Sequence, residues 1–245
     1  MEQPTLSLII PAYNEHARIL ASLRGVAAFF EQQNYPYEVL LVDNASTDGT
    51  GKIAREFAAN HPWLQVIDEP RKGKGNAVKT GMLAATGKYR MFADADFSMP
   101  VDQIPRFLPP LTPDPEIVIA TREGKGAKRY NEPFMRHLSG RFFNLLVQFM
   151  ALPGIHDSQC GFKLFRGDIA EDLFPLLTIG GWTFDVEALY IARQRKYRIA
   201  QIGVPWYYNG DSKVKMLTDS IAMFRDLRTI RANAKAGLYN RIVLE

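Results

Sequence analysis

Two carboxylates close the stretch Met91-Phe92-Ala93-Asp94-Ala95-Asp96, whose apolar part begins at Tyr89. A short apolar run of this kind predicts a buried parallel strand. Because side chains alternate along an extended chain, we expect Asp94 and Asp96 to point to the same side. Paired hard oxygens suit Mg²⁺ or Mn²⁺, and such a metal is typically shared with substrate phosphates. Asp94 and Asp96 are therefore candidate metal ligands, and the alternative is a solvated acidic turn.

Three further apolar runs precede this stretch, at residues 6–10, 37–42 and 64–67. Segments with apolar residues at helical spacing separate them. Strand and helix in alternation predict an α/β fold, a doubly wound and mostly parallel sheet flanked by helices. Right-handed crossovers would place Asp43, at the end of the second run, on the same sheet edge as Asp96. Ligands bind at that edge in open α/β sheets.

The composition suits one soluble domain. The chain has 245 residues, 47% of them apolar, which is enough for a single core. The single Cys160 excludes an internal disulfide and, together with the lack of a signal peptide, indicates a cytoplasmic setting. No apolar run approaches the ~20 residues of a membrane-spanning helix, so we expect none. The net charge of +4 favours anionic ligands or lipid, and no motif indicates nucleic acid.

A basic, glycine-containing loop at residues 71–76 comes directly before a predicted helix. Its Lys72, Lys74 and glycine amides could meet a pyrophosphate, whereas Lys74 could also be a solvated loop charge. Asp43 could accept hydrogen bonds from a base or ribose, or it could be a turn or cap carboxylate. No Gly-x-Gly-x-x-Gly follows the first strand and no Walker loop is present, which argues against a classical dinucleotide or P-loop site.

Four motifs in order resemble those of the family 2 inverting glycosyltransferases, which have the GT-A fold. They are residues 9–15 (IIPAYNE), 42–50 (VDNASTDGT), 73–77 (GKGNA) and 94–96 (DAD). Three later motifs resemble the branch that makes polyprenyl-phosphate sugars, above all the dolichyl-phosphate β-glucosyltransferases. They are residues 157–163 (DSQCGFK), 181–187 (GWTFDVE) and 210–214 (GDSKV). The resemblance extends over roughly residues 5–220.

This resemblance implies a single GT-A domain over residues 1–245. It would have a nucleotide-binding half at 1–100, an acceptor-binding half at 101–213 and a C-terminal helical segment at 214–245. It also implies a nucleotide-sugar donor, with UDP-glucose expected, and a metal, Mg²⁺ or Mn²⁺, held by Asp94 and Asp96. The other implied donor-site residues are Pro11, Tyr13, Glu15 and Asp43 around the base and ribose, and Lys74 near the diphosphate. Mannose synthases of this branch usually have Gln at the position of Ser98, so a GDP-mannose donor is disfavoured.

The acceptor is expected to be an anion. A sugar hydroxyl would need a carboxylate base, for which Asp157 is the best candidate, whereas a phosphate monoester is already ionised at neutral pH. The second half of the chain offers many cations for such an acceptor: Arg122, Lys125, Lys128, Arg129, Arg136, Arg141, Lys163 and Lys213. Each alone is more often a surface charge, but the set favours an anionic acceptor.

Residues 133–152 predict a helix with a wide apolar face, including Phe142, Leu145 and Phe149. That face suits contact with lipid, and the alternatives are a core helix or a dimer seam. A long helix from residue 214 onward carries arginines on one side and could lie on anionic lipid or cover the sheet. Trp182 is expected to form part of an acceptor wall or to serve packing alone.

Together these observations predict a metal-dependent inverting glucosyltransferase that acts on a polyprenyl phosphate, peripherally at the cytoplasmic (inner) face of a membrane. The predicted catalytic residues are Asp96, Asp157, Arg122, Arg136 and Lys213. One alternative is a family 2 enzyme that acts on a glycan or protein hydroxyl with Asp157 as base. The other is a non-catalytic module that binds nucleotide sugars or recruits to membranes.

Overall fold

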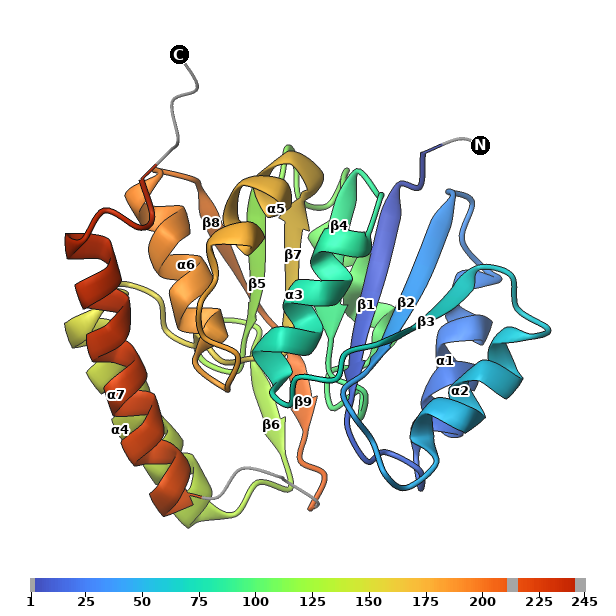
Figure 1. The fold of residues 1–245 in the computed structure, drawn as a ribbon, viewed down its shortest axis with the longest axis horizontal. Helices are drawn as coiled ribbons and strands as arrows, with labels where there is room; N and C mark the ends of the chain where they lie inside the picture. The colour runs from blue at the N-terminus through green and yellow to red at the C-terminus, as the bar shows by residue number, and fades with distance from the viewer. Residues whose placement is uncertain (1–2, 211–215, 241–245) are drawn as a thin grey trace.

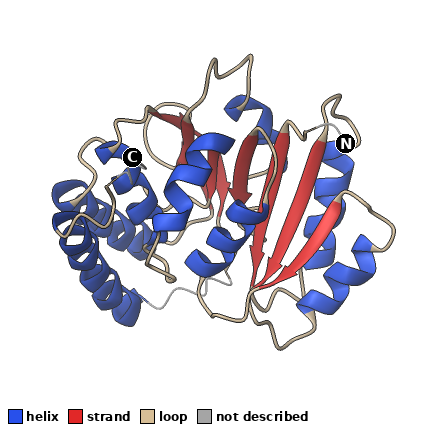
Figure 2. Ribbon diagram, turned by 45° about the horizontal axis from the view of Figure 1, so that its top comes forward, coloured by secondary structure: helices blue, strands red, loops and turns tan. Residues whose placement is uncertain are grey.

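A seven-stranded sheet forms the centre of the protein (Figure 2). The computed structural model describes residues 3–210 and 216–240, without the side chains of 134–139, 142–143 and 216–221. In order across the sheet the strands are β3 (Leu64–Asp68), β2 (Tyr37–Asp43), β1 (Leu6–Ala12), β4 (Tyr89–Ala93), β7 (Phe162–Arg166), β5 (Ile117–Thr121) and β8 (Ile199–Gly203). Strand β7 runs antiparallel to both β4 and β5, and the other pairs are parallel. The predicted mostly parallel sheet is confirmed.

Helices cover both faces of this sheet (Figure 1), which explains why strands such as β4 and β5 are mainly apolar runs rather than alternating ones. One face carries α1 (Ile19–Phe30), α2 (Thr50–Ala58) and the 3₁₀ helix η1 (Val101–Phe107). The other carries α3 (Lys74–Ala84), α5 (Gly167–Leu173), the 3₁₀ turn η2 (Phe174–Leu176) and α6 (Phe184–Gln194). Each layer has its own buried apolar cluster, and the sheet separates the two.

Helices α4 (Phe134–Met150) and α7 (Met216–Lys235) lie side by side at the β8 end of the molecule (Figures 1 and 2). Val147 of α4 and Leu227 of α7 are fully buried in the core, whereas Leu145 is 62% and Phe149 90% exposed. The predicted helix at 133–152 therefore packs on the core with one side and leaves apolar groups in solvent on the other. No helix in the described ranges combines the length and apolar content needed to span a membrane.

A small parallel pair of strands, β6 (Lys128–Tyr130) and β9 (Pro205–Tyr207), extends the molecule beyond the sheet edge at which the parallel strands end (Figure 1). The rings of Tyr130 and Tyr207 stack with centroids 4.5 Å apart. The backbone N–H of Tyr207 donates to the carbonyl of Ser98 at 2.8 Å, which ties this pair to the segment after β4. The pair thus stands beside the candidate site.

Candidate functional site

A cavity of about 510 Å³ lies along the carboxyl edge of the sheet. This volume is ordinary for a small-molecule site. Its walls come from the ends of β1 and β4, the start of α3, the helices α4 and α6, and β9. The predicted site residues that line it are Pro11, Tyr13, Glu15, Lys74, Asp94, Asp96, Arg122 and Asp157. Residues predicted from separate motifs are therefore brought to one cavity.

Asp94 and Asp96 both line this cavity, but not for the reason the sequence suggested. Strand β4 ends at Ala93, and a turn follows in which the N–H of Phe97 donates to the carbonyl of Asp94 at 3.0 Å. The expectation of an extended chain through Asp96 was wrong. The N–H of Ser98 donates to the Asp96 carboxylate at 2.9 Å, so the turn itself orients this side chain.

Gly161 allows the close approach of the Asp94 carboxylate. The N–H of Asp94 donates to the carbonyl of Gly161 at 3.0 Å, and a Cβ at residue 161 would overlap both carboxylate oxygens of Asp94. The register of β4 against β7, with Ala93 opposite Phe162, brings these two residues together. A glycine is needed here because of space, since no unusual backbone angle is involved.

Lys74, the first residue of α3, forms an ion pair with Asp94. Its side chain is only 15% exposed, and its ammonium lies 5.7 Å from the centre of the Trp182 ring. Burial alone would lower the pKa of Lys74, but the carboxylates of Asp94, Asp185 and Asp96 outweigh it and raise the pKa above its ordinary value. The ammonium is therefore charged at neutral pH.

The two carboxylates have the chemistry of a divalent-metal site completed by a ligand. Hard carboxylate oxygens suit Mg²⁺ or Mn²⁺, and both side chains face the same cavity. Within the described part of the chain, no group of three or more His, Cys, Asp or Glu side chains could hold a metal ion. Phosphate oxygens of a ligand would therefore have to supply further coordination.

Asp43 is the one predicted donor residue that does not line the cavity. It is 8% exposed, its carboxylate accepts from the N–H of Ser46 at 3.2 Å, and it packs against Gly51 in the first turn of α2. These contacts are those of a turn carboxylate, which was the alternative to base or ribose binding for Asp43. The next residue, Asn44, does line the cavity and holds the basic loop, because it accepts from the N–H of Gly73 at 2.8 Å.

Asp157 is fully engaged by Arg122. The guanidinium donates to both carboxylate oxygens, at 2.7 and 2.9 Å, and the backbone N–H of Arg122 donates at 2.9 Å. Burial alone would raise the pKa of Asp157, but the charge and hydrogen bonds of Arg122 outweigh it and lower the pKa. A carboxylate held in this way is a weak proton acceptor. Its evident role is to fix Arg122 in the cavity wall, over the ring of Trp206.

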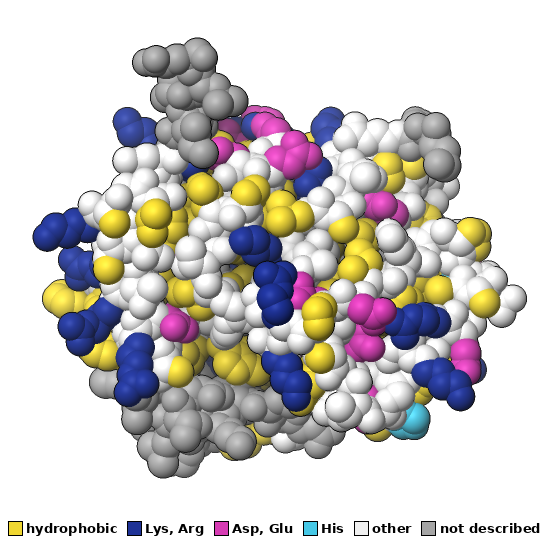
Figure 3. All heavy atoms as spheres, in the orientation of Figure 1, with side chains coloured by type: hydrophobic (Ala, Val, Ile, Leu, Met, Phe, Trp, Pro, Cys, Tyr) yellow, Lys and Arg dark blue, Asp and Glu magenta, His cyan; other side chains and the backbone are white. Residues whose placement is uncertain are grey.

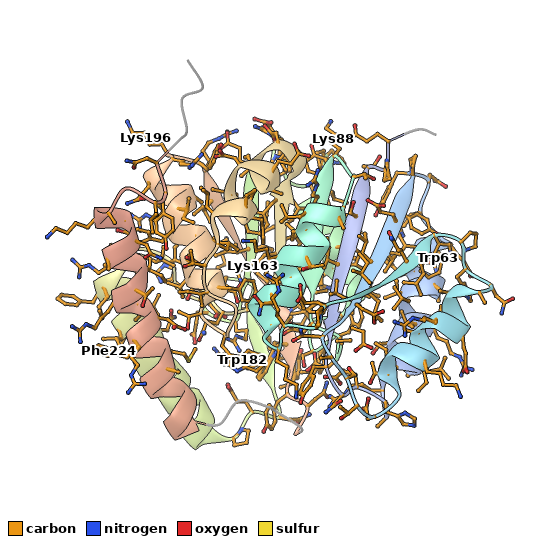
Figure 4. The ribbon with its side chains drawn as sticks, viewed as in Figure 1. Trp63, Lys88, Lys163, Trp182, Lys196 and Phe224 are labelled. Atoms are coloured by element: carbon orange, nitrogen blue, oxygen red, sulfur yellow. The ribbon has the colours of Figure 1, made fainter. Side chains whose placement is uncertain are left out.

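Two of the other predicted cations are also paired with carboxylates of the protein. Lys163 is 1% exposed and donates to Asp185 at 2.8 Å and to the carbonyl of Cys160 at 2.6 Å, so its inclusion among the cations for an acceptor was wrong. Figure 4 shows Lys163 in the interior of the molecule, whereas Trp182 lies toward the edge at which the strands end. Arg129 lines the cavity but is paired with Glu123 and Glu132.

The remaining predicted cations differ in position. Arg141 of α4 is exposed, lines the cavity and has no ion pair with any described residue. Lys125 and Lys128 are exposed and lie outside the cavity lining. Arg136 lies in the first turn of α4, with its side chain outside the described part, and Lys213 lies outside the described residues altogether. Both of these remain predictions.

One cavity residue that was not singled out as a site residue is Asp185, in the first turn of α6. It is 3% exposed, and burial raises its pKa although Lys163 and Lys74 oppose this. Its neighbour Glu187 accepts from Thr178 and from the N–H of Ile179, and so fixes the loop before Trp182. Two acidic residues within an otherwise apolar helix were the available signal.

Comparison with known proteins gives the family of this chain. The family model "Glycosyl transferase family 2" matches residues 7–174. Three relatives carry the name dolichyl-phosphate beta-glucosyltransferase. That of Drosophila melanogaster is 36% identical and covers 96% of this chain and 76% of its own length. That of Saccharomyces cerevisiae is 33% identical, with 97% and 77% covered, and that of Homo sapiens is 32% identical, with 97% and 79% covered.

The fold is also found in solved structures. Glucosyl-3-phosphoglycerate synthase from Mycobacterium tuberculosis, in complex with UDP, superposes with a TM-score of 0.67 at 19% identity, over 96% of this chain and 80% of that one. Its complex with Mn²⁺, UDP and phosphoglyceric acid gives a TM-score of 0.66 at 18% identity, over 96% and 79%. The GT-A fold is thereby confirmed. With the family model and these relatives in agreement, the chain belongs to glycosyltransferase family 2.

Proposed function

We propose that the protein transfers glucose from UDP-glucose to the phosphate of a polyprenyl phosphate, with inversion at the sugar and with Mg²⁺ or Mn²⁺ as cofactor. One observation carries this proposal. The same cavity is lined by Lys74, Asp94 and Asp96, and also by Arg141 and by Arg122, which Asp157 holds. A diphosphate and a second anion could therefore be bound in one site.

The identity of the donor is supported by the basic loop and by the relatives. Lys74 and the N-terminus of α3 offer positive charge to a diphosphate, and Tyr13 and Pro11 offer an apolar wall to a base. The relatives' name specifies a glucosyl group and dolichyl phosphate. The division into a nucleotide-binding half at 1–100 and an acceptor-binding half at 101–213 is part of the same proposal.

The state of Asp157 favours a phosphate acceptor over a hydroxyl. A hydroxyl acceptor needs a base in the cavity, and the base predicted for it already accepts three hydrogen bonds from Arg122. A phosphate monoester has a second pKa near ~6 and needs no proton removed at neutral pH. Arg122 would instead bind and orient it, since a guanidinium matches the geometry of phosphate oxygens.

In the reaction, an oxygen of the acceptor phosphate attacks the anomeric carbon as the bond from that carbon to the diphosphate breaks. The electron pair of that bond passes to the diphosphate. Arg122 and Arg141 would hold the attacking phosphate, and Lys74 would lie against the departing one. A divalent cation held by Asp94 and Asp96 would neutralise charge on the leaving group. Alignment and charge neutralisation are thus the main contributions of this chain.

A lipid acceptor requires contact with a membrane, and the α4–α7 face suits it. Phe149 and Leu145 of α4 are exposed, and Phe224 is exposed on the outer side of α7 (Figure 4). Lys and Arg side chains gather over α7 along one flank (Figure 3), contributed by Arg225, Arg228, Arg231 and Lys235. Apolar anchors beside cations suit peripheral binding to anionic lipid. Arg141 and Met223 of the same two helices line the cavity, so a membrane bound at this face would lie close to it. We propose that the α4–α7 face meets the cytoplasmic leaflet.

The decisive experiment measures glucose transfer from radiolabelled UDP-glucose to a short polyprenyl phosphate, with Mg²⁺, Mn²⁺ or chelator. UDP-galactose and GDP-mannose serve as competing donors, and the matching polyprenol serves as a hydroxyl acceptor. Product formed only with UDP-glucose, metal and the phosphate would support the proposal. Transfer to the polyprenol or to a glycan instead would favour the hydroxyl-acceptor alternative. Binding of UDP-glucose without transfer to any acceptor would favour the non-catalytic module.

A further inference from the structure

The carboxylate expected to hold a metal is already engaged by a cation of the protein itself. Asp94 is paired with Lys74, and this ammonium has further carboxylates, Asp185 and Asp96, close enough to act on its charge. Its side chain is largely buried in the cavity wall and lies beside Trp182. The ion pair is therefore part of a largely buried cluster of charges in the cavity wall rather than a chance surface contact.

The backbone of Lys74 is fixed, so only its side chain can move. The N–H of Gly73 donates to Asn44, whose amide donates in turn to the carbonyl of Arg71 at 2.8 Å. On the other side, the N–H of Asn76 donates to the carbonyl of Gly180 at 3.3 Å. A Cβ on Gly75 would overlap the 179–180 segment, so the start of α3 is pressed against it. The ammonium can leave Asp94 by rotation of its four-carbon stem alone.

A divalent cation and the Lys74 ammonium would compete for Asp94. With Lys74 in place, the Asp94 carboxylate is already paired. A metal ion that approaches Asp94 would also be repelled by the positive charge of the Lys74 ammonium. A diphosphate changes this balance, because its oxygens attract the ammonium and also supply ligands to the metal. The nucleotide and the metal should then each strengthen the binding of the other.

We propose that Lys74 makes metal binding at Asp94 depend on the nucleotide. In the free protein the ammonium occupies Asp94. The diphosphate draws the ammonium to itself and leaves the carboxylate for the metal. This inference rests on the proposed donor and metal site, and it adds an order to their use: the free enzyme does not hold its metal firmly. It does not depend on the identity of the acceptor.

The test measures Mn²⁺ binding to the full chain without nucleotide, from the electron paramagnetic resonance signal of free Mn²⁺. We expect Lys74→Met to bind Mn²⁺ at least about tenfold more tightly than the wild type, although a residue of the donor site has been removed. Lys74→Arg, which keeps the positive charge, should bind as weakly as the wild type. Lys72→Met is the matched control. Lys72 lies in the same loop and lines the cavity near Tyr13, so this change should alter Mn²⁺ affinity by less than about twofold.

A second measurement follows the coupling between the two ligands. The factor by which Mn²⁺ tightens UDP binding, after correction for the Mn²⁺–UDP complex in solution, should be clearly smaller in Lys74→Met than in the wild type. Equal Mn²⁺ affinity of wild type and Lys74→Met would overturn the proposal. An equal gain in Lys72→Met would do so as well, since it would show a general charge effect.

The same experiment separates this inference from the proposed function. If Lys74→Met gains Mn²⁺ affinity and the double variant Lys74→Met, Asp94→Asn loses it, the competition is established whatever the acceptor proves to be. If the double variant keeps the gain, Asp94 is not a ligand, and both the competition and the proposed metal site are wrong. Failure of glucose transfer to polyprenyl phosphate leaves the Mn²⁺ result unaffected, because neither acceptor nor sugar is present in the binding assay.

Discussion

The replacement Asp157→Asn separates two roles for a buried carboxylate. In the structure Asp157 fixes Arg122 through three hydrogen bonds, with side chains 5% and 22% exposed. An Asn keeps the shape but loses the negative charge and can no longer accept both guanidinium bonds. Removing one partner of a buried ion pair costs about 3–5 kcal/mol. Because Arg122 is partly exposed, we expect about 3 kcal/mol, which for a protein of this size lowers Tm by about 6–12 °C.

The expected effect on catalysis is moderate. If Asp157 positions Arg122, its loss should reduce kcat/KM toward the phosphate acceptor by about tenfold, mainly through KM, which corresponds to about 1.4 kcal/mol. If Asp157 is instead the general base, its loss should reduce kcat by about 10²–10⁴-fold. Thermal unfolding followed by circular dichroism, and steady-state transfer assays on the same preparation, measure both quantities.

Asp168→Asn provides a matched control for the stability measurement. Asp168 forms the same two-bond pair with Arg166, at 2.7 and 3.0 Å, but its side chain is 64% exposed. An exposed pair is worth about 1 kcal/mol or less, so Tm should fall by no more than about 4 °C. The reasoning fails if Asp157→Asn leaves Tm unchanged while kcat is lost, since the carboxylate would then act in chemistry rather than in holding Arg122.

Three further predictions follow from the described contacts. Gly161→Ala should displace the carboxylate of Asp94 and lower transfer activity by about 100-fold at saturating metal, whereas Gly25→Ala, with open space around it, should leave activity unchanged in the same assay. The pKa of Glu69 is lowered to about 2, chiefly by hydrogen bonds from the neighbouring Arg71. The ionised Glu69 therefore stabilises the folded protein above the ordinary pKa of a glutamate, and this stabilisation is lost as the pH falls. Denaturant titrations between about pH 5 and pH 2 should show the wild type losing more stability than Glu69→Gln, and equal losses would contradict this. Tyr239→Phe removes a 2.7 Å hydrogen bond to a buried carboxylate and should destabilise the protein by about 2 kcal/mol in urea unfolding, a value near zero being the contrary result.

Much of the structure of the first 100 residues could be predicted because the signals there are local. Strands β1, β2 and β4 are largely buried on both faces, so each is a mainly apolar run with polar residues at or just after its end at the ligand edge. The edge strand β3 is only partly buried. The order of these runs fixes the parallel topology through right-handed crossovers. Lys74, Asp94 and Asp96 reach one cavity for this reason.

The contacts of the other cavity residues were harder to predict because they join distant segments. Nothing local to Lys163 shows that Asp185, 22 residues later, neutralises it between the sheet and α6. Similarly, Arg122 and Asp157 are 35 residues apart, and only the fold shows that a candidate base is an ion-pair partner. The turn at Asp94 was also missed, since the alternation of an extended strand predicts the same side for both carboxylates. Tertiary pairing decides these points, and residue type alone does not.

The reversed direction of β7 determines which segment of the chain lies beside Asp94 in the cavity. A parallel strand would bring its final residue, Arg166, to the ligand edge, whereas β7 brings its first, Phe162, opposite Ala93. The segment from Asp157 to Gly161 therefore arrives beside Asp94 from the opposite chain direction. A slip of one residue between β4 and β7 would turn the side chains of β7 to the other face and carry Gly161 away from Asp94. The position of the 157–161 segment relative to Asp94 is thus set by backbone pairing, which side-chain substitutions in the cavity leave intact.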